Sequence, residues 1–289
     1  MNADNQLLVP AAGETASPVA KTRPVCYRDG AMRGRHDDSV VREEPLEIRV
    51  RGQSVAVTMR TPGHDQELAA GFLLTEGLVK QPQDIIEITP CQRGDTEGAE
   101  NILNVFLAPS VEIDVGKLTR HFFASSSCGL CGKASIEAVQ QHFPPVISDL
   151  AVSAERLIDL PRRLAATQTT FDQTGGLHAA AIFDAHGNLL VAREDVGRHN
   201  AVDKVIGHGL LNDLLPFDSH ILLVSGRASF EIMQKALAAR IPVVAAVSAP
   251  SSLAVAFAEA GGQTLIGFLR NGRFNIYTGM ERITAGSGD

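Results

Sequence analysis

Two cysteines separated by two residues, Cys128 and Cys131, stand in the stretch Ser125 to Lys133, where serines precede the pair and a glycine follows each thiol. Thiols at this spacing can form a disulfide, supply half of a zinc site, or carry sulfur from one molecule to another. Serine and glycine give a polar backbone that bends easily, so we expect a mobile loop. The residues that follow predict a helix over 133–141, and a thiol beside a helix N-terminus and a lysine is favoured as the thiolate.

The spacing of the two thiols leaves their chemistry open. The pair could be buried and structural, or it could hold zinc. The remaining cysteines, Cys26 and Cys91, are single, and neither has a close histidine at ligand spacing. A thioredoxin-like pair would closely follow an early strand of a βαβ unit, whereas this pair follows a long β-rich segment. We favour a reactive pair that handles sulfur, and we assign no metal ligands.

Polar, glycine-rich loops form a second set of candidates, because each stands between a predicted strand and a predicted helix. They are residues 193–200, 225–229 and 248–252. In an open α/β sheet, ligands bind beyond the carboxyl ends of the strands, where helix N-termini present free N–H groups. The three loops should therefore meet at one edge. Serine and aspartate also cap helices in proteins without a ligand, and for the serines of the last loop that role alone explains the sequence equally well.

Basic and small residues of these loops are the candidate binding residues. They are Arg198, His199, Ser225, Gly226 and Arg227, together with Arg270 and Arg273, which flank a turn near the end of the chain. Arginine binds phosphate through two parallel hydrogen bonds, so these side chains favour an anionic ligand. A solvated rim of positive charges is the alternative.

Hydrophobic periodicity divides the chain into four segments. Residues 1–40 lack periodicity and predict a disordered or loosely attached tail, whereas residues 41–120 predict a small β-rich subdomain. Residues 121–145 hold the mobile cysteine loop and its helix. Residues 146–289 alternate strands with helices, which predicts a cofactor-binding α/β domain with three layers and a mixed sheet.

Turn and cap residues place the elements within these segments. In the small subdomain, a hairpin is predicted around Gly52-Gln53, followed by a helix that Asp65 caps and that stops near Gly77. In the larger domain, a helix begins at Ser153, and the last two strands form a hairpin over Asn271-Gly272.

Composition limits the possible functions. The chain has 289 residues, 44% of them hydrophobic and 20% charged, with a net charge of −7 and a pI near 5.7. This charge argues against broad electrostatic binding of nucleic acid or of an anionic membrane. The sequence shows neither a signal-peptide core nor an apolar run long enough to span a bilayer, and four cysteines make no disulfide framework. We expect a cytoplasmic protein in a reducing compartment.

Four segments together resemble the formate dehydrogenase accessory sulfurtransferases, the FdhD family, over roughly residues 40–285. They are SCGLCG (127–132), EDVGRHNAVDK (194–204), SGR (225–227) and GFLRNGRF (267–274). The second segment is far more specific than the cysteine pair. The resemblance implies a fold similar to that of cytidine deaminases, preceded by a small β-rich part.

The resemblance also implies a function. Members of the family take persulfide sulfur from a cysteine desulfurase and pass it to the bis-molybdopterin guanine dinucleotide cofactor, which then goes to formate dehydrogenase. By this resemblance Cys128 carries the persulfide and Cys131 is its partner. The segment assigned to the guanine nucleotide, for which GDP would serve as a surrogate ligand, comprises Phe268, Leu269, Arg270, Asn271, Gly272 and Arg273.

Two other classes of function remain for comparison. A deaminase-like fold raises zinc-dependent hydrolysis of a base, but that chemistry needs an H-x-E segment before P-C-x-x-C, and no such segment stands upstream of Cys128. A non-catalytic chaperone that only binds the cofactor and its enzyme would not need the thiols. The flat edges expected of the α/β domain favour a homodimer.

Overall fold

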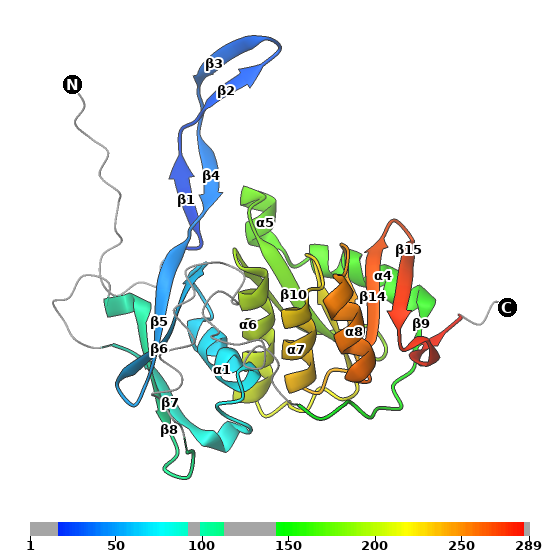
Figure 1. Ribbon diagram of the computed structural model, residues 1–289. Helices are drawn as coiled ribbons and strands as arrows, with labels where there is room; N and C mark the ends of the chain where they lie inside the picture. Colours follow the sequence, from blue (N-terminus) through cyan, green and yellow to red (C-terminus); the bar gives the residue numbers. More distant parts are fainter. Residues whose placement is uncertain (1–16, 92–98, 113–142, 286–289) are drawn as a thin grey trace.

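The computed structural model describes residues 17–91, 99–112 and 143–285 (Figure 1). Within these ranges, the first half of the chain forms a four-stranded sheet and the second half forms a six-stranded sheet. No helix of the described residues is long and apolar enough to cross a membrane. The mixed α/β architecture expected from the sequence is confirmed, whereas the relation to cytidine deaminases stays a prediction.

The six-stranded sheet has the strand order β11-β10-β12-β13-β14-β15. Its strands are β10 (His178–Asp184), β11 (Leu189–Asp195), β12 (His220–Val224), β13 (Val243–Ala246), β14 (Thr264–Arg270) and β15 (Arg273–Thr278). The neighbours β12, β13 and β14 run parallel, and the other neighbours pair antiparallel. The carboxyl ends of β11, β12, β13 and β14 therefore meet the amino ends of β10 and β15 at one edge, which we call the ligand edge.

Helices cover both faces of this sheet. They are α4 (Ala154–Ala165), α5 (Thr169–Thr174), α6 (Arg198–Leu211), α7 (Phe230–Ala238) and α8 (Ser252–Ala260). Alternate strand residues point to opposite faces. One face, which includes Ile182 and Leu222, packs on α6, α7 and α8, and the other, which includes Phe183 and Leu223, packs on α4. Because both faces are buried, the strands are almost continuously apolar.

Serine caps begin two of these helices. Ser153 accepts a hydrogen bond from Arg156 N at 3.4 Å before α4, which agrees with the predicted helix start. Ser251 accepts one from Ala254 N at 3.2 Å before α8, so this loop serine does serve as a cap. A short parallel pair, β9 (Val152–Ser153) with β16 (Ile283–Thr284), and the 3-10 turn η3 (Met280–Arg282) bring the end of the described chain to α4.

The smaller sheet has the order β6-β5-β8-β7 and packs against one helix. Its elements are β5 (Glu44–Val50), β6 (Gln53–Arg60), α1 (Asp65–Thr75), η1 (Pro82–Asp84), β7 (Ile85–Pro90), η2 (Ala99–Asn101) and β8 (Ile102–Leu107). The predicted hairpin is present, with Arg51 (φ 51°) and Gly52 (φ 78°) in the turn. His64, rather than Asp65, stands at the cap position of α1, because the carboxylate of Asp65 is bound to Arg60 instead.

Helices α1 and α6 cross with their backbones in close approach. A Cβ atom on Gly71 would overlap the carbonyl of Asp203, and one on Gly207 would overlap the carbonyl of Glu67. Only glycine allows this distance. Leucines of the small sheet and of α1 consequently belong to the same hydrophobic cluster as the valines of α6, so the two sheets share one core.

A β-ribbon precedes the small sheet and projects from the body of the molecule (Figure 1). It consists of β1 (Val19–Thr22) paired with β4 (Asp38–Val41), and of β2 (Val25–Arg28) paired with β3 (Ala31–Arg35). The predicted unstructured tail is therefore wrong for these residues. Most of their side chains are exposed, so the strands form through their own pairing and not through burial. The turn Asp29-Gly30, with φ of 54° and 77°, is a hairpin signal of the Asp-Gly type that the absence of periodicity obscured.

Candidate functional site at the ligand edge

Three loops continue the hydrogen bonding of the sheet beyond the ends of its strands. Ser225 donates its N–H to Ala179 O (2.9 Å), and its Oγ accepts from Ala179 N (2.8 Å). Ser248 N donates to Gly226 O (3.4 Å), and Phe268 N donates to Ser248 O (3.0 Å). The loops after β12, β13 and β14 thus form one continuous surface. It brings the predicted residues Ser225, Gly226 and Arg227 to the same edge as the terminal hairpin.

The loop between β11 and α6 supplies Arg198 and His199. His199 Nε2 lies 2.7 Å from Glu231 Oε2 and 3.3 Å from Ser229 Oγ, which joins the first turn of α6 to the first turn of α7. Arg198 begins α6, and its buried Nε has no acceptor among the residues that the structure describes. An arginine placed in this way is prepared to bind a ligand anion.

His178, the first residue of β10, lies in the same group, although the sequence did not identify it. An added Cβ on Gly226 would be 3.3 Å from His178 Nδ1 and 3.8 Å from Arg198 Cβ, so the imidazole packs on the glycine beside the arginine. Burial, followed by the positive charges of Arg198 and neighbouring groups, lowers the pKa of His178 below its ordinary value. The rule for open sheets points to the carboxyl ends of strands, whereas β10 is antiparallel and brings its amino end here.

The terminal hairpin forms the rim of the edge. Asn271 (φ 54°) and Gly272 (φ 71°) make the turn between β14 and β15, and Leu269 is buried while Arg270 and Arg273 are exposed. The guanidinium carbon of Arg270 lies 5.7 Å from the centre of the Phe268 ring, which is within cation–π range. Phe268 itself has a φ of 56°, a conformation that is uncommon outside glycine.

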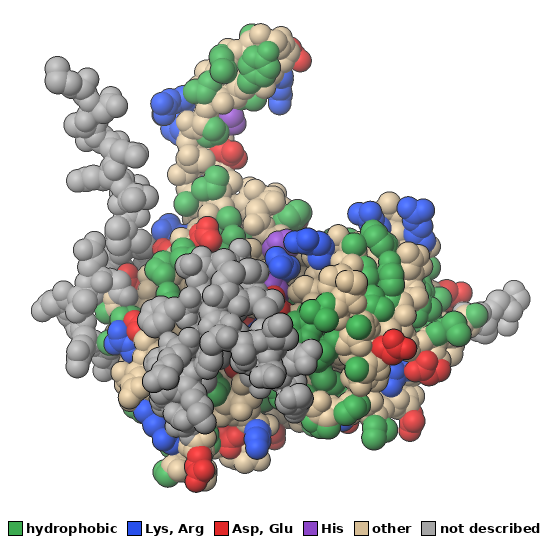
Figure 2. Space-filling model, in the orientation of Figure 1, with side chains coloured by type: hydrophobic (Ala, Val, Ile, Leu, Met, Phe, Trp, Pro, Cys, Tyr) green, Lys and Arg blue, Asp and Glu red, His purple; other side chains and the backbone are tan. Residues whose placement is uncertain are grey.

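Positive charge gathers around this edge in the surface view. Figure 2 shows lysine or arginine side chains at the tip of the terminal hairpin, and a second group of basic and histidine side chains between that hairpin and the ribbon. The chain as a whole has a net charge of −7, so this group is a local exception. Such a concentration attracts anions at one place without making the protein generally basic.

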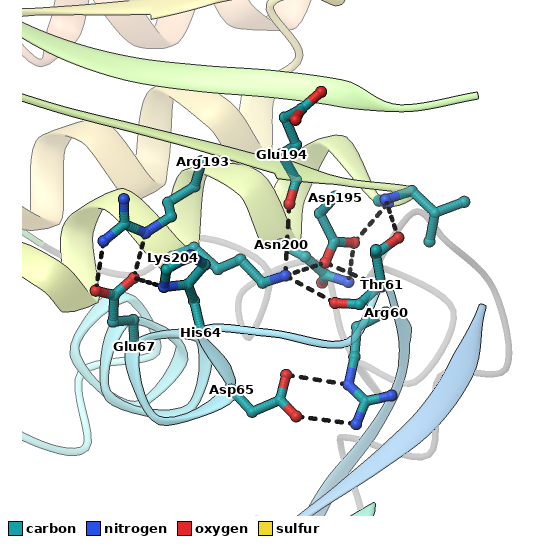
Figure 3. A network of polar contacts seen from close by, with 12 residues as sticks. Arg60, Thr61, His64, Asp65, Glu67, Arg193, Glu194, Asp195, Asn200 and Lys204 are labelled. Atoms are coloured by element: carbon teal, nitrogen blue, oxygen red, sulfur yellow. Dashed lines mark hydrogen bonds and ion pairs between the residues drawn. The ribbon is translucent and has the colours of Figure 1, made fainter. Parts of the chain in front are cut away.

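A buried ion pair fixes the loop that carries Arg198 (Figure 3). Lys204 Nζ lies 2.7 Å from Asp195 Oδ2, and the two side chains are 1% and 0% exposed. The carboxylate of Asp195 also accepts from Thr61 N (3.2 Å), Gly197 N (2.8 Å) and Asn200 Nδ2 (3.0 Å). Its hydrogen bonds therefore hold the backbone before α6 and tie it to the end of β6.

The same network reaches the small sheet from several directions. Lys204 Nζ donates to Thr61 O at 2.9 Å, and Asn200 Nδ2 donates to Met59 O at 2.8 Å. Val196 N donates to Thr61 Oγ1 at 3.2 Å. Val196, Asn200 and Lys204 all belong to segment 194–204, which the sequence singled out. Their role in joining the two sheets depends on Thr61 and Met59, which are distant in the sequence and lie beside them in the fold.

A second polar cluster anchors α1 instead of facing the ligand edge. Arg193 binds both carboxylate oxygens of Glu67 at 2.6 and 2.7 Å (Figure 3), and His208 Nδ1 lies 3.0 Å from Glu67 Oε1. Burial alone would raise the pKa of Glu67, but the hydrogen bonds from Arg193 and His208 outweigh it and lower the pKa. Arg193 is thus a structural residue.

The cysteine pair, Cys128 and Cys131, lies outside the described residues, as do the predicted mobile loop and its helix. The single cysteines Cys26 and Cys91 have free thiols. Among the described residues, no group of three or more His, Cys, Asp and Glu side chains could hold a metal ion. The assignment of sulfur chemistry to the pair therefore rests on the sequence and on relatives.

A hollow of about 510 Å³ lies on the small sheet, away from the ligand edge. Its lining includes Arg49, Arg51 and Cys91, and it shares no residue with the three loops. Arg49 is already bound to Glu47 at 2.9 and 2.8 Å, and Arg51 donates to Val111 O at 2.7 Å. Because these donors are occupied within the protein, the hollow offers an anion fewer unpaired donors than the ligand edge does.

Comparison with known proteins agrees with the segments that the sequence singled out. Residues 41–284 match the model of the FdhD/NarQ family. A protein named "Sulfur carrier protein FdhD" from Streptomyces coelicolor is 52% identical over 268 residues, which cover 91% of this chain and 95% of that protein. A protein with the same name from Mycobacterium tuberculosis is 54% identical over 249 residues, covering 84% and 90%.

A solved structure is also similar. The crystal structure of a protein described as a formate dehydrogenase accessory protein from Desulfotalea psychrophila has a TM-score of 0.75 and 26% sequence identity, covering 93% of this chain and 100% of that one. Both the family model and the close relatives span most of the chain, including the ligand edge. The chain therefore belongs to the FdhD/NarQ family.

Proposed function

We propose that this protein is a sulfur carrier, a sulfurtransferase that receives persulfide sulfur from a cysteine desulfurase and delivers it to the bis-molybdopterin guanine dinucleotide cofactor of formate dehydrogenase. The observation that carries this proposal is the identity of more than half of the aligned residues with proteins named as sulfur carriers, over 91% of the chain in one case. The ligand edge supports it, because it gathers positive groups in an acidic protein.

The thiols would do the chemistry. The thiolate of Cys128 attacks the outer sulfur of the donor persulfide, the donor's S–S bond breaks, and the donor leaves as a thiolate. Cys128 then carries the persulfide. Attack of the Cys131 thiolate on the inner sulfur releases the outer one as hydrosulfide and leaves a disulfide between the two cysteines, which a cellular dithiol then reduces. Cys131 in this way supplies the electrons that turn persulfide sulfur into sulfide.

The ligand edge would hold the cargo. Arg198 and Arg227 stand at the loops that open α6 and α7, so their guanidinium groups and the free N–H groups of the helices can bind phosphates together. The terminal hairpin, Phe268 to Arg273, would hold a guanine nucleotide, with GDP as a surrogate for the cofactor. The protein would act in the cytoplasm as a homodimer, with the desulfurase and formate dehydrogenase as successive partners.

Mass spectrometry of the intact protein tests the carrier function. After incubation with a cysteine desulfurase and cysteine, we expect the protein to gain sulfur, and we expect Cys128→Ala to abolish both that gain and the activation of formate dehydrogenase. Cys131→Ala should still gain sulfur but release it slowly. Cys91→Ala is the control, because its thiol is free but lies away from the ligand edge. A Cys128→Ala protein that still activates the enzyme would favour the non-catalytic chaperone instead.

Nucleotide binding tests the cargo site. GDP should bind and raise the melting temperature by mass action. The double variant Arg270→Ala/Arg273→Ala should weaken binding, since each lost charge-assisted hydrogen bond costs roughly 1.5 to 3 kcal/mol. Arg162→Ala is the matched control, because Arg162 is an exposed arginine on α4 whose carboxylate partner is Asp159. Equal GDP affinity in the double variant and the control would place the nucleotide elsewhere.

A further inference from the structure

Two arginines at the ligand edge differ from the structural arginines of the protein in having no partner among the described residues. Neither Arg198 nor Arg227 makes a hydrogen bond through its side chain or an ion pair with any residue of the described ranges. By contrast, Arg60 binds Glu44 and Asp65, and Arg193 binds Glu67. Arg227 is exposed, but the Nε atom of Arg198 is buried, and a buried positive group without a partner is costly and persists where a ligand supplies the missing anion.

His178 completes this group from a third element. Its imidazole lies on Gly226, beside Arg198, while Ser225 Oγ is used by Ala179 N. The ring itself accepts and donates no hydrogen bond within the described part of the chain. Within the described residues, the charged groups that act on the ring come from three places: Arg198 and His199 from α6, Asp195 from the end of β11, and Arg227 from the loop after β12.

The two histidines at this edge have different surroundings. His199 is held by Glu231 at 2.7 Å, so its ring is fixed between α6 and α7. The carboxylate of Asp195, the other nearby acid, is fully engaged by Lys204 and by three further donors. His178 is therefore the titratable group that has positive neighbours but no carboxylate free to balance a proton.

We propose that His178 is a binding residue for the phosphate-bearing ligand and that it takes up a proton when the ligand binds. This inference rests on the proposed nucleotide site. In the free protein, burial and the charges of Arg198, His199 and Arg227 disfavour the protonated imidazole. A phosphate bound among the arginines reverses the local potential, so the ring gains a proton and donates a charge-assisted hydrogen bond to the ligand.

The sign of the pH dependence follows from this linkage. The pKa of His178 lies below its ordinary value in the free protein and rises when the anion is bound. Between the two pKa values the complex binds more protons than the free protein does. The part of the GDP affinity that His178 supplies should consequently fall as the pH rises from about 5 to 8, the range in which histidine titrates.

Calorimetric titration of the full-length protein with GDP tests the proposal. At fixed pH, titrations in buffers of different ionisation enthalpy give the number of protons taken up, and titrations over the pH range give the affinity profile. We expect His178→Gln to bind GDP about tenfold more weakly at low pH, because one charge-assisted hydrogen bond is lost. We also expect this variant to take up fewer protons than the wild type when GDP binds. Ionisation of the GDP phosphates contributes equally to both proteins, so the difference between them isolates the histidine.

His220→Gln is the matched control. His220 is half-buried in the same sheet, and burial lowers its pKa as well, but it begins β12 and lies at the opposite edge. This variant should retain the wild-type proton uptake and pH profile. Melting curves confirm that both variants fold, and the ring signals of His178 in the NMR spectrum, with and without GDP, report its protonation directly.

The outcomes separate this inference from the function it rests on. If GDP binds the wild type and His178→Gln with the same affinity profile and proton uptake, His178 is not a ligand contact and the nucleotide site stands. A histidine signal that does not change on GDP binding would likewise rule out the protonation of His178. If the wild type binds neither GDP nor inorganic pyrophosphate, the nucleotide site and the role of His178 are both wrong.

Discussion

Helix α6 carries two buried ion pairs between lysine and aspartate, and they are built differently. Lys204 binds Asp195, whose carboxylate also accepts from backbone N–H groups of two loops. Asp203, the neighbour of Lys204 in sequence, binds Lys235 of α7 at 2.7 Å and accepts from Thr75 Oγ1 at 2.9 Å. The first pair organises loop backbone at the ligand edge, whereas the second joins the side chains of three helices.

The different surroundings of the two ion pairs indicate that they have different structural roles. Burial alone would lower the pKa of Lys235, but the charges of Asp203 and Glu76 outweigh it and raise the pKa, so the lysine stays charged in the core. Its ammonium donates to both oxygens of Asp203 and to Thr75 Oγ1. We conclude that the Asp203 pair maintains the helix packing, and that the Asp195 pair in addition positions Arg198.

Replacing Asp195 should have the largest effect, because it removes both a buried charge and the acceptor of the loop. In Asp195→Asn, the amide NH₂ group faces Lys204 Nζ and Thr61 N. All of these groups are hydrogen-bond donors, so none of them can accept from another. We expect a loss in the upper part of the roughly 3 to 5 kcal/mol that breaking a buried pair costs, measured by urea unfolding. GDP binding should fall as well, even under conditions where the variant is folded. Undiminished GDP affinity in the folded variant would remove the positioning role and make the two pairs equivalent.

Replacing Lys235 should destabilise the fold without altering the ligand edge. Lys235→Met keeps a similar shape but leaves Asp203 with Thr75 as its remaining partner, at a cost of about 3 kcal/mol, the low end for such pairs. The double variant Lys235→Met/Asp203→Leu should regain much of that stability, because no unpaired charge remains. Both are measured by urea unfolding, with GDP binding as the second readout. A change in GDP affinity of the folded protein would contradict the division of tasks.

An alanine at the helix crossing tests how tightly the two pairs are held together. Gly71→Ala places a methyl group against the carbonyl of Asp203, which should separate α1 from α6 and cost roughly 1 to 3 kcal/mol. Gly34→Ala in the ribbon is the control, because a Cβ there meets nothing within 4 Å. If the two variants melt at the same temperature, the close approach of the helices contributes nothing to stability.

Acid should weaken the polar cluster of Glu67, Arg193 and His208 between α1 and the larger sheet. We expect this effect on stability to be smaller than those of the three preceding substitutions. The folded pKa of Glu67 lies below the ordinary 4.5, so its contribution to stability is present above that value and is lost as the pH falls through the folded pKa. Glu67→Gln should therefore be less stable than the wild type at neutral pH, and the gap should narrow below about pH 4.5. Urea midpoints measured against pH give this difference directly. A gap that stays constant with pH would mean that the charge of Glu67 is not what stabilises α1.

Local patterns in the sequence were sufficient to predict most of the larger sheet. The predicted helix start at Ser153 and the hairpin over Asn271-Gly272 are present, because each depends on residues that are neighbours in the chain. The loops after β12 and β13 meet as expected, since parallel strands must end at the same edge.

Long-range contacts account for what the sequence did not predict. Thr61 and Asp195 lie 134 positions apart, and no local pattern connects them. His178 was missed because its place at the ligand edge depends on the antiparallel direction of β10. The ribbon was missed for a different reason: its strands are short and exposed, so they lack the alternation of apolar residues by which strands are usually found.

The glycine crossing of α1 and α6 also has a consequence for the synthesis of the protein on the ribosome. Helix α1 begins at Asp65 and its partner α6 at Arg198, so α1 is synthesised on the order of 10 s before α6 at elongation rates of about 5 to 20 residues per second. During that interval the apolar residues of α1 and of the small sheet lack the α6 valines that share their hydrophobic cluster. The nascent chain thus exposes an apolar surface to which chaperones can bind, and slowing translation before residue 198 should increase aggregation more than slowing it afterwards.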